Sequence, residues 1–144
     1  MNDPFDLERF VAAQDAGGTY AQAVEELRRG HKTSHWMWFV FPQIAGLGSS
    51  GMSQRYAIGS LAEAQAYLRH PVLGPRLLEC ERLVVAASAR TAEQIFGGID
   101  AQKLHSSTTL FLRAEPTEPV FQQVLDRFFA GRPDAATDQR LGSS

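Results

Sequence analysis

The sequence lacks the residues and segments that mark several classes of protein. It has one cysteine, Cys80, in 144 residues, which excludes an internal disulfide and a cysteine-based zinc cluster. Its longest apolar run, residues 36–42, is far shorter than the roughly 20 residues that cross a bilayer. The acidic N-terminus has no basic segment before an apolar stretch, so it does not resemble a secretory signal. We therefore expect a cytoplasmic protein without a membrane span.

An excess of charge of one sign is also missing. The chain has 14 lysines and arginines against 16 aspartates and glutamates, a formal net charge of -2. Such a balance gives no overall attraction to nucleic acid or to an anionic membrane, so we expect neither as a partner. The length, with 44% hydrophobic residues and no repeat or low-complexity linker, is typical of one globular domain.

Apolar residues are present at helical spacing along most of the chain, without the strict alternation of strands. This pattern predicts an all-α fold, a single compact domain of about six to eight short helices. We expect the domain to span residues 1–134, with a polar C-terminal tail at 135–144.

Local signals predict where the helices begin and end. Capping boxes occur at Ser60 and Thr91, and Thr19, Asp100 and Thr117 are further candidate N-caps. The corresponding helices are expected over residues 19–29, from 60 to about 68–70, from 91 to the glycines at 97–98, over 100–104 and from 117 to about 130, with others over 6–14 and 75–89. In the helix over residues 19–29, Glu25 and Glu26 are expected opposite the buried face.

The distribution of charge along the chain is uneven. No Asp or Glu occurs in the 36 residues between Glu26 and Glu63, although this window contains three arginines and Lys32. A second acid-free window, residues 101–114, contains Lys103, His105 and Arg113. If the two windows fold together, they create a local positive potential and hence an anion site. The alternative is that the first window has few charges because it is buried.

The segment 32–43 concentrates polar and aromatic side chains. Lys32, Ser34, Trp36, Trp38 and Gln43 are candidate ligand-binding residues, and His35 is a candidate acid–base group because an imidazole exchanges protons near neutral pH. For the aromatic residues the alternative is simple core packing, since they occur at helical spacing in an apolar run.

A glycine-rich string follows, from Gly46 to Gly51, and matches the pattern G-x-G-x-x-G. A dinucleotide fold also needs a preceding strand and an acidic residue about 20 positions onward, and both are missing here. Two interpretations stay open: a phosphate-cradling loop in which Gly48 allows close approach, or a flexible connection. Arg55, just beyond, is either an anion ligand or an ordinary surface arginine.

The second polar cluster spans residues 103–109. Lys103, Ser106, Ser107 and Thr108 are candidate ligand-binding residues, and His105 is a second candidate acid–base group with Asp100 as its nearest acidic neighbour. The alternative is that the four successive hydroxyl residues bond back to carbonyls of their own helix.

Metal and cofactor chemistry finds little support. His31 and His35 have ligand-like spacing, but their segment lacks the glutamate of a metalloprotease helix, so we expect no metal site and no cofactor. The leucine- and valine-rich surroundings of Cys80 favour core packing over a reactive thiol.

Several strings of residues are familiar as a set. They are Arg9-Phe10-Val11 with Gln14, Ser34-His35-Trp36-Met37-Trp38-Phe39 with Phe41-Pro42-Gln43, Gly46-Leu47-Gly48, Tyr67-Leu68, His70-Pro71 with Leu73-Gly74, Ile95-Phe96-Gly97, and Lys103 with Ser106-Ser107 and Thr109-Leu110-Phe111. Together, up to about Asp134, they resemble the bacterial domain-of-unknown-function family 1810. The resemblance implies an all-helical fold and transfers no catalytic residue. Some members are labelled calpastatin-like, but that inhibitor class is largely disordered, whereas this composition is that of a packed domain.

Two functions of different classes follow. The first is binding of a phosphate-bearing or other anionic, nucleotide-like small molecule in a pocket of His, Lys and Ser side chains, with hydrolysis or transfer as an extension. The second is a non-catalytic protein–protein interaction module that uses Trp38, Phe41 and exposed apolar surface. The sequence leaves the oligomeric state open.

Overall fold

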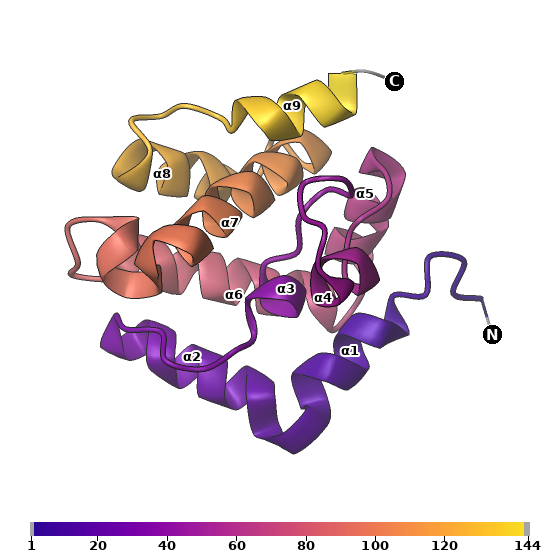
Figure 1. Ribbon diagram of the computed structural model, residues 1–144, viewed down its shortest axis with the longest axis horizontal. Helices are drawn as coiled ribbons and strands as arrows, with labels where there is room; N and C mark the ends of the chain where they lie inside the picture. Colours follow the sequence, from indigo (N-terminus) through magenta and orange to yellow (C-terminus); the bar gives the residue numbers. More distant parts are fainter. Residues whose placement is uncertain (1, 143–144) are drawn as a thin grey trace.

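The computed structural model describes residues 2–142 and shows the all-α fold that the sequence predicts (Figure 1). This part of the chain has nine α-helices, seven of them with eight residues or more, and one 3-10 helix. An isolated parallel bridge joins Ile44 and Ile58. The helices are α1 (Glu8–Asp15), α2 (Thr19–Arg29), α3 (Met37–Val40), α4 (Gly51–Arg55), α5 (Leu61–Arg69), α6 (Leu73–Ala86), α7 (Ala92–Ala114), α8 (Pro119–Phe128) and α9 (Ala135–Gly142), and the 3-10 helix is η1 (Ala16–Gly18).

The long helix α7 runs through the middle of the molecule (Figure 1). Helix α5 packs against α6 and α7, and α8 packs against the same two helices. The α1–α2 pair lies along α6, and α9 lies on α7 (Figure 1). One core joins these elements, and its largest fully buried side chains include Trp36, Tyr67, Phe10, Phe41 and Phe111.

Both predicted capping boxes are present. Ser60 Oγ accepts the backbone N–H of Glu63 at 3.1 Å, and Thr91 Oγ1 accepts that of Gln94 at 3.2 Å. The side chains of Glu63 and Gln94 reach back to the N–H just before each cap. These reciprocal bonds satisfy donors that a helix start leaves free, which explains why the two starts were predictable.

Two other expected caps are wrong by one residue. Helix α2 begins after Gly18, in a left-handed conformation, and the Thr19 hydroxyl donates to the carbonyl of Ala16 at 2.6 Å. Helix α8 is capped by Glu118, whose carboxylate accepts the Val120 N–H at 3.2 Å. At α8 a neighbouring carboxylate replaces the expected hydroxyl, whereas at α2 a glycine in the left-handed conformation takes the cap position without a side-chain bond.

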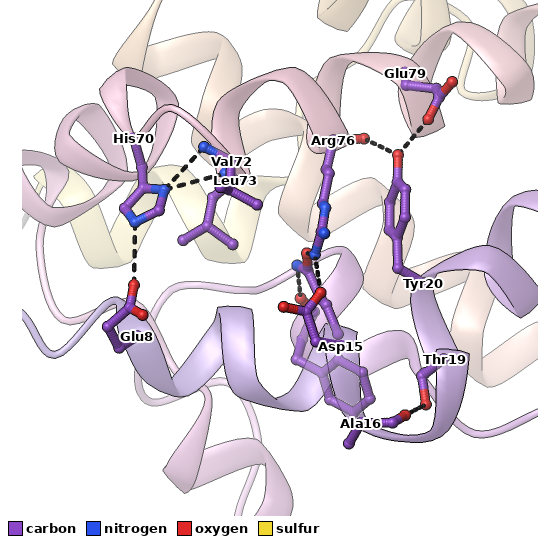
Figure 2. A network of polar contacts seen from close by, with 12 residues as sticks. Glu8, Asp15, Ala16, Thr19, Tyr20, His70, Val72, Leu73, Arg76 and Glu79 are labelled. Atoms are coloured by element: carbon purple, nitrogen blue, oxygen red, sulfur yellow. Dashed lines mark hydrogen bonds and ion pairs between the residues drawn. The ribbon is translucent and has the colours of Figure 1, made fainter.

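An imidazole caps α6. Pro71 separates this helix from α5, and His70 Nδ1 accepts the N–H groups of Val72 at 3.1 Å and Leu73 at 3.2 Å (Figure 2). The other ring nitrogen, Nε2, lies 3.3 Å from a carboxylate oxygen of Glu8 in α1 (Figure 2). Because Nδ1 accepts, the proton of the neutral ring is on Nε2, facing that carboxylate.

Helix α7 is longer than expected. Gly97, with φ +79° and ψ 168°, interrupts its first turns, as the glycine pair predicted. The following helix does not end near Leu104 but continues to Ala114, so Asp100 lies inside α7 and is not its cap. The hydroxyls of Ser106 and Thr109 donate to the carbonyls four residues earlier, at 3.2 and 2.8 Å. Two of the four successive hydroxyl residues thus show the back-bonding that the sequence left open as an alternative.

Where the sequence suggested a polar tail, the structure has helix α9. Its start is organised by Asp134, which is buried and accepts both the N–H and the hydroxyl of Thr137, at 3.1 and 2.7 Å. An ion pair of 2.8 Å between Arg113 and Asp138 adds a contact between α7 and α9. Composition alone does not reveal these specific polar partners; residues 143–144 of the expected tail lie outside the described range.

Two expectations from composition can be compared directly with the structure. Cys80 is fully buried in α6, which confirms its core role, and burial raises the pKa of its thiol to about 12. Within residues 2–142 no helix combines the length and apolarity that crossing a membrane requires.

Candidate functional site

The two acid-free windows meet at a groove of about 620 Å³. The first window contributes α3, α4 and the loop between them, and the second contributes Gln102 and Lys103 of α7, to which Ile99 of the same helix is added. No Asp or Glu is among the lining residues, which are Trp38, Gln43, Leu47, Gly48, Ser49, Ser50, Ser53, Ile99, Gln102 and Lys103. The groove therefore contains four predicted ligand-binding residues: Trp38, Gln43, Gly48 and Lys103.

Lys103 provides the positive charge of this groove. Its Nζ lies 4.8 Å from the centroid of the Trp38 ring and 3.4 Å from a carboxylate oxygen of Asp100. The other oxygen of Asp100 lies 2.8 Å from Nζ of Lys32, which is largely buried. Two lysines thus share one carboxylate, so positive side chains outnumber negative ones in this group.

A smaller compartment of about 180 Å³ adjoins the groove, and the two share Trp38, Gln43, Gly48 and Ser53. No charged side chain lines the smaller compartment, whose other lining residues are Ile44, Ala45, Gly46, Gln54, Tyr56 and Ala57. Backbone bonds from Ile58 to Gln43 and from Ala45 to Ile58, both 2.8 Å, fix its walls. The combined site has a cationic part and an uncharged part.

The glycine-rich string forms the loop between these compartments. Gly46 has φ +96°, and a Cβ there would lie 2.6 Å from the guanidinium carbon of Arg140 in α9. That arginine donates to the Gly46 carbonyl at 3.0 Å. A Cβ on Gly48 would collide with the Ser53 side chain at 2.7 Å. The positive φ favours glycine at position 46, and the short Ser53 side chain leaves little room for a Cβ at position 48, whatever the loop binds.

Helix α9 contacts both sides of the groove. Arg140 bonds the loop at Gly46, and Asp134, just before α9, accepts the side-chain amide of Gln102 in α7 at 3.1 Å. Burial raises the pKa of Asp134, but hydrogen bonds from Thr137, Ser106 and Gln102 outweigh that effect, so its pKa lies below the ordinary value. An ionised Asp134 thus anchors one groove residue.

Sequence reasoning missed Glu26, which organises the segment before α3. Glu26 was expected on the exposed side of α2, and that expectation is wrong: it is fully buried. Its carboxylate accepts the N–H groups of Thr33 and Ser34, the Ser34 hydroxyl and the Trp36 indole N–H, at 2.6 to 3.0 Å. The available signal was its position three residues after buried Ala23 and just before a polar loop.

These bonds assign structural roles to three predicted site residues. Ser34 and Trp36 are bonded to Glu26, and Lys32 contacts Asp100 and, at 5.0 Å, the Trp36 ring. None of the three lines the groove. They hold the loop from which α3 and Trp38 continue.

The two candidate acid–base histidines are not among the groove residues. His35 is exposed. His105 Nε2 lies 2.7 Å from the carbonyl oxygen of Arg132, and its ring stacks on Phe129 with a centroid distance of 4.1 Å. The structure therefore brings neither imidazole to Lys103, and His105 serves the connection between α8 and α9.

The remaining candidates also lie outside the groove lining. Arg55 is exposed, with its guanidinium carbon 5.4 Å from the centroid of the adjacent Tyr56 ring. Ser106, Ser107 and Thr108 are buried in α7. Ser106 donates to Asp134 at 3.0 Å and Thr108 donates to Glu81 at 2.9 Å, whereas Ser107 Oγ has no hydrogen-bond partner among the described residues.

The groups in the groove can form hydrogen bonds and ionic contacts with a ligand, but they are not typical metal ligands. Amides, hydroxyls, an indole and one ammonium line it. In residues 2–142 no three His, Cys, Asp or Glu side chains come together in a way that could hold a metal ion.

Comparison with known proteins agrees with the fold. The crystal structure of the conserved hypothetical protein Rv1873 from Mycobacterium tuberculosis is similar, with 52% sequence identity and a TM-score of 0.95 over 99% of this chain and 100% of that one. No curated protein gives a significant match. A family model described as "Protein of unknown function (DUF1810)" matches residues 4–141, beyond the expected end near Asp134 and into α9. The chain therefore belongs to the DUF1810 family.

Proposed function

We propose that the groove binds an anionic small molecule that carries an aromatic ring, of which a nucleotide is the simplest example. The observation that supports this most is the Lys103 ammonium held beside the Trp38 ring; no carboxylate is among the lining residues, and the one that pairs with Lys103, Asp100, is shared with Lys32. A cation attracts an anionic group, and an exposed indole edge or face offers stacking for a flat ring.

The two compartments suit the two parts of such a ligand. The larger one supplies Lys103 to an anion; of its serines, Ser50 donates to Ser53 Oγ and Ser53 donates to the Ser50 carbonyl, so these two hydroxyls are already used at the start of α4. The smaller one, free of charged side chains, suits the ring, and the amide of Gln43 is available to both. The combination of an apolar surface with a few polar groups is typical of small-molecule sites.

The proposal covers binding and assigns no catalytic step. Neither His35 nor His105 lines the groove, so hydrolysis or transfer has no acid–base group there at neutral pH. A cytoplasmic location likewise stays a prediction from the sequence.

Calorimetric titration of the full chain with nucleotides, sugar phosphates and inorganic phosphate tests the proposal. We expect saturable binding of at least one nucleotide, weakened about 10-fold or more by Lys103→Gln and largely restored by Lys103→Arg, since a charged hydrogen bond contributes about 1.5–3 kcal/mol. Arg90→Gln is the matched control, because it removes a positive charge from an exposed residue outside the groove. No saturable binding, or equal effects of the two charge-removing variants, would contradict the proposal.

One observation favours the second function, a protein–protein interaction module. Ile99 is 78% exposed at the edge of the groove, an unusual position for a large apolar side chain. Phe41, the other expected contact residue, is fully buried against Trp36 and Phe96 and cannot take part. Sedimentation velocity of the wild type and of Ile99→Ser tests this second function. Self-association of the wild type that the variant abolishes would support the interaction module.

A further inference from the structure

A separate cavity of about 370 Å³ lies where the C-terminal ends of α5 and α7 meet the start of α8. It shares no lining residue with the groove, and its volume is within the usual range of small-molecule sites. Its lining residues are Gln65, Leu68, Arg69, Leu78, Ala114, Glu115, Thr117, Glu118, Pro119 and Phe121.

Charges of both signs line this cavity without neutralising one another. Arg69 comes from α5, whereas Glu115 and Glu118 come from the connection between α7 and α8. No ion pair joins Arg69 to either glutamate, and its guanidinium has no hydrogen-bond partner among the described residues. Arg69 and Glu115 are exposed and Glu118 is half-buried, so a ligand can reach all three charged groups.

The present contacts of Glu115 and Glu118 leave both carboxylates able to accept further hydrogen bonds. Glu115 accepts the Thr117 hydroxyl, and Glu118 accepts the Val120 N–H at 3.2 Å. The nearest cation to Glu118 is Arg82, at 4.0 Å. Each carboxylate retains further acceptor sites, because one carboxylate can accept several hydrogen bonds.

The rest of the wall is apolar and stiff. Leu68, Leu78 and Phe121 contribute apolar lining from three different helices, α5, α6 and α8. Pro116 and Pro119 restrict the backbone of the connection, and a bond of 3.2 Å from the Glu118 N–H to the Glu115 carbonyl closes a turn there. A preformed wall lowers the entropic cost of binding.

We propose that this cavity is a binding site for a zwitterionic α-amino acid with an apolar side chain. Its carboxylate pairs with Arg69, its ammonium group with Glu115 and Glu118, and its side chain contacts Leu68, Leu78 and Phe121. A simple anion would meet two glutamates and a simple cation would meet the arginine, so a ligand with both charges fits best.

Methyl NMR titration of the full chain with leucine and phenylalanine tests this site. We expect saturable shifts confined to the methyl groups of Leu68 and Leu78 and their neighbours. Leucinamide, which lacks the carboxylate, and 4-methylpentanoate, which lacks the amine, should bind about 10-fold more weakly or worse, because each loses one charged pair. Arg69→Gln and Glu115→Gln should have similar effects.

Two controls separate this site from general charge effects. Arg90→Gln removes an exposed charge elsewhere and should bind leucine as the wild type does, and Lys103→Gln should do the same, because Lys103 lines the other groove. The absence of saturable shifts with both amino acids would overturn the proposal. So would an Arg69→Gln protein that binds leucine as tightly as the Arg90→Gln protein, or equal binding of leucine and leucinamide.

Discussion

Two buried glutamates show how differently this fold treats the same side chain. Glu26 in α2 and Glu81 in α6 are both fully buried. Glu26 accepts five hydrogen bonds, one from Gln22 and four from the segment 33–36. Among residues 2–142, the Thr108 hydroxyl alone donates to Glu81, at 2.9 and 3.3 Å to its two oxygens.

The pKa values of the two carboxyls shift in opposite directions. Burial favours the neutral form of both, but at Glu26 the bonds from Ser34, Gln22 and Thr33 outweigh burial and hold the pKa far below its ordinary value. At Glu81 burial dominates and raises the pKa to about 8, although the Thr108 bond opposes it. The difference arises because a loop has free N–H groups to donate, whereas the N–H groups inside packed helices are already bonded.

The largest expected effect is the loss of the Glu26 carboxylate. Glu26→Gln replaces one acceptor oxygen by an amide that faces donors, so we expect about 3 kcal/mol of destabilisation in urea unfolding at pH 7. Glu25→Gln, one residue earlier and exposed, breaks only a 3.9 Å contact with Arg29 and should change stability by about 0.5 kcal/mol at most. Similar effects of the two substitutions would contradict the structural role of Glu26.

The sign of the pH dependence follows from the lowered pKa of Glu26. Its stabilisation is complete above the unfolded value near 4.5 and is lost as pH falls below it. The Glu26→Gln protein should therefore lose less stability than wild type between about pH 5 and pH 3.

Glu81 should behave in the opposite way. A raised pKa gives stability that is complete below about 4.5 and is lost as pH rises towards about 8. Glu81→Gln removes the ionisation and should stabilise the protein by about 2 kcal/mol at pH 7 to 8, while the difference disappears near pH 4. Unfolding free energies of both proteins across this range provide the test, and a variant that is less stable than wild type at pH 8 would show that Glu81 is ionised in the fold.

The difference between bonds within a short segment and bonds between distant segments also explains which features the sequence could predict. Helix starts at Ser60 and Thr91 depend on residues three positions apart, and such local bonds can be identified without a structure. The groove was partly predictable too, because an acid-free stretch around Trp38 and another around Lys103 indicate where positive potential accumulates.

The features that the sequence did not predict depend on contacts between residues that are distant in sequence. Spacing within α2 does not show that Glu26 faces a loop ten residues ahead, nor that the hydroxyls of Ser106 and Thr108 turn towards Asp134 and Glu81. A polar side chain next to a lysine suggests a ligand, but a buried carboxylate elsewhere in the chain can satisfy it equally well. No sequence pattern indicated the cavity beside Arg69, because its charged residues come from segments about 46 residues apart.

His70 is intermediate between the two glutamates in the number of donors that it has. Its Nδ1 accepts two backbone N–H groups (Figure 2). His70→Ala leaves the N–H groups of Val72 and Leu73 without this cap, so we expect a loss of about 1 kcal/mol at pH 7. His70→Asn, a good capping side chain, should restore most of it. Thermal unfolding of the three proteins measures both effects, and equal stability of the alanine and asparagine variants would exclude capping as the role of His70.

The smallest expected effect concerns Ser107, which has a buried hydroxyl without a donor or acceptor partner in the described chain. Since an unsatisfied polar group costs free energy, Ser107→Ala should leave stability unchanged or raise it by up to about 1 kcal/mol. Ser106→Ala, the adjacent control, removes a bond to Asp134 and should destabilise by about 1 kcal/mol. A marked loss at Ser107 instead would mean that its hydroxyl has a partner such as a bound water.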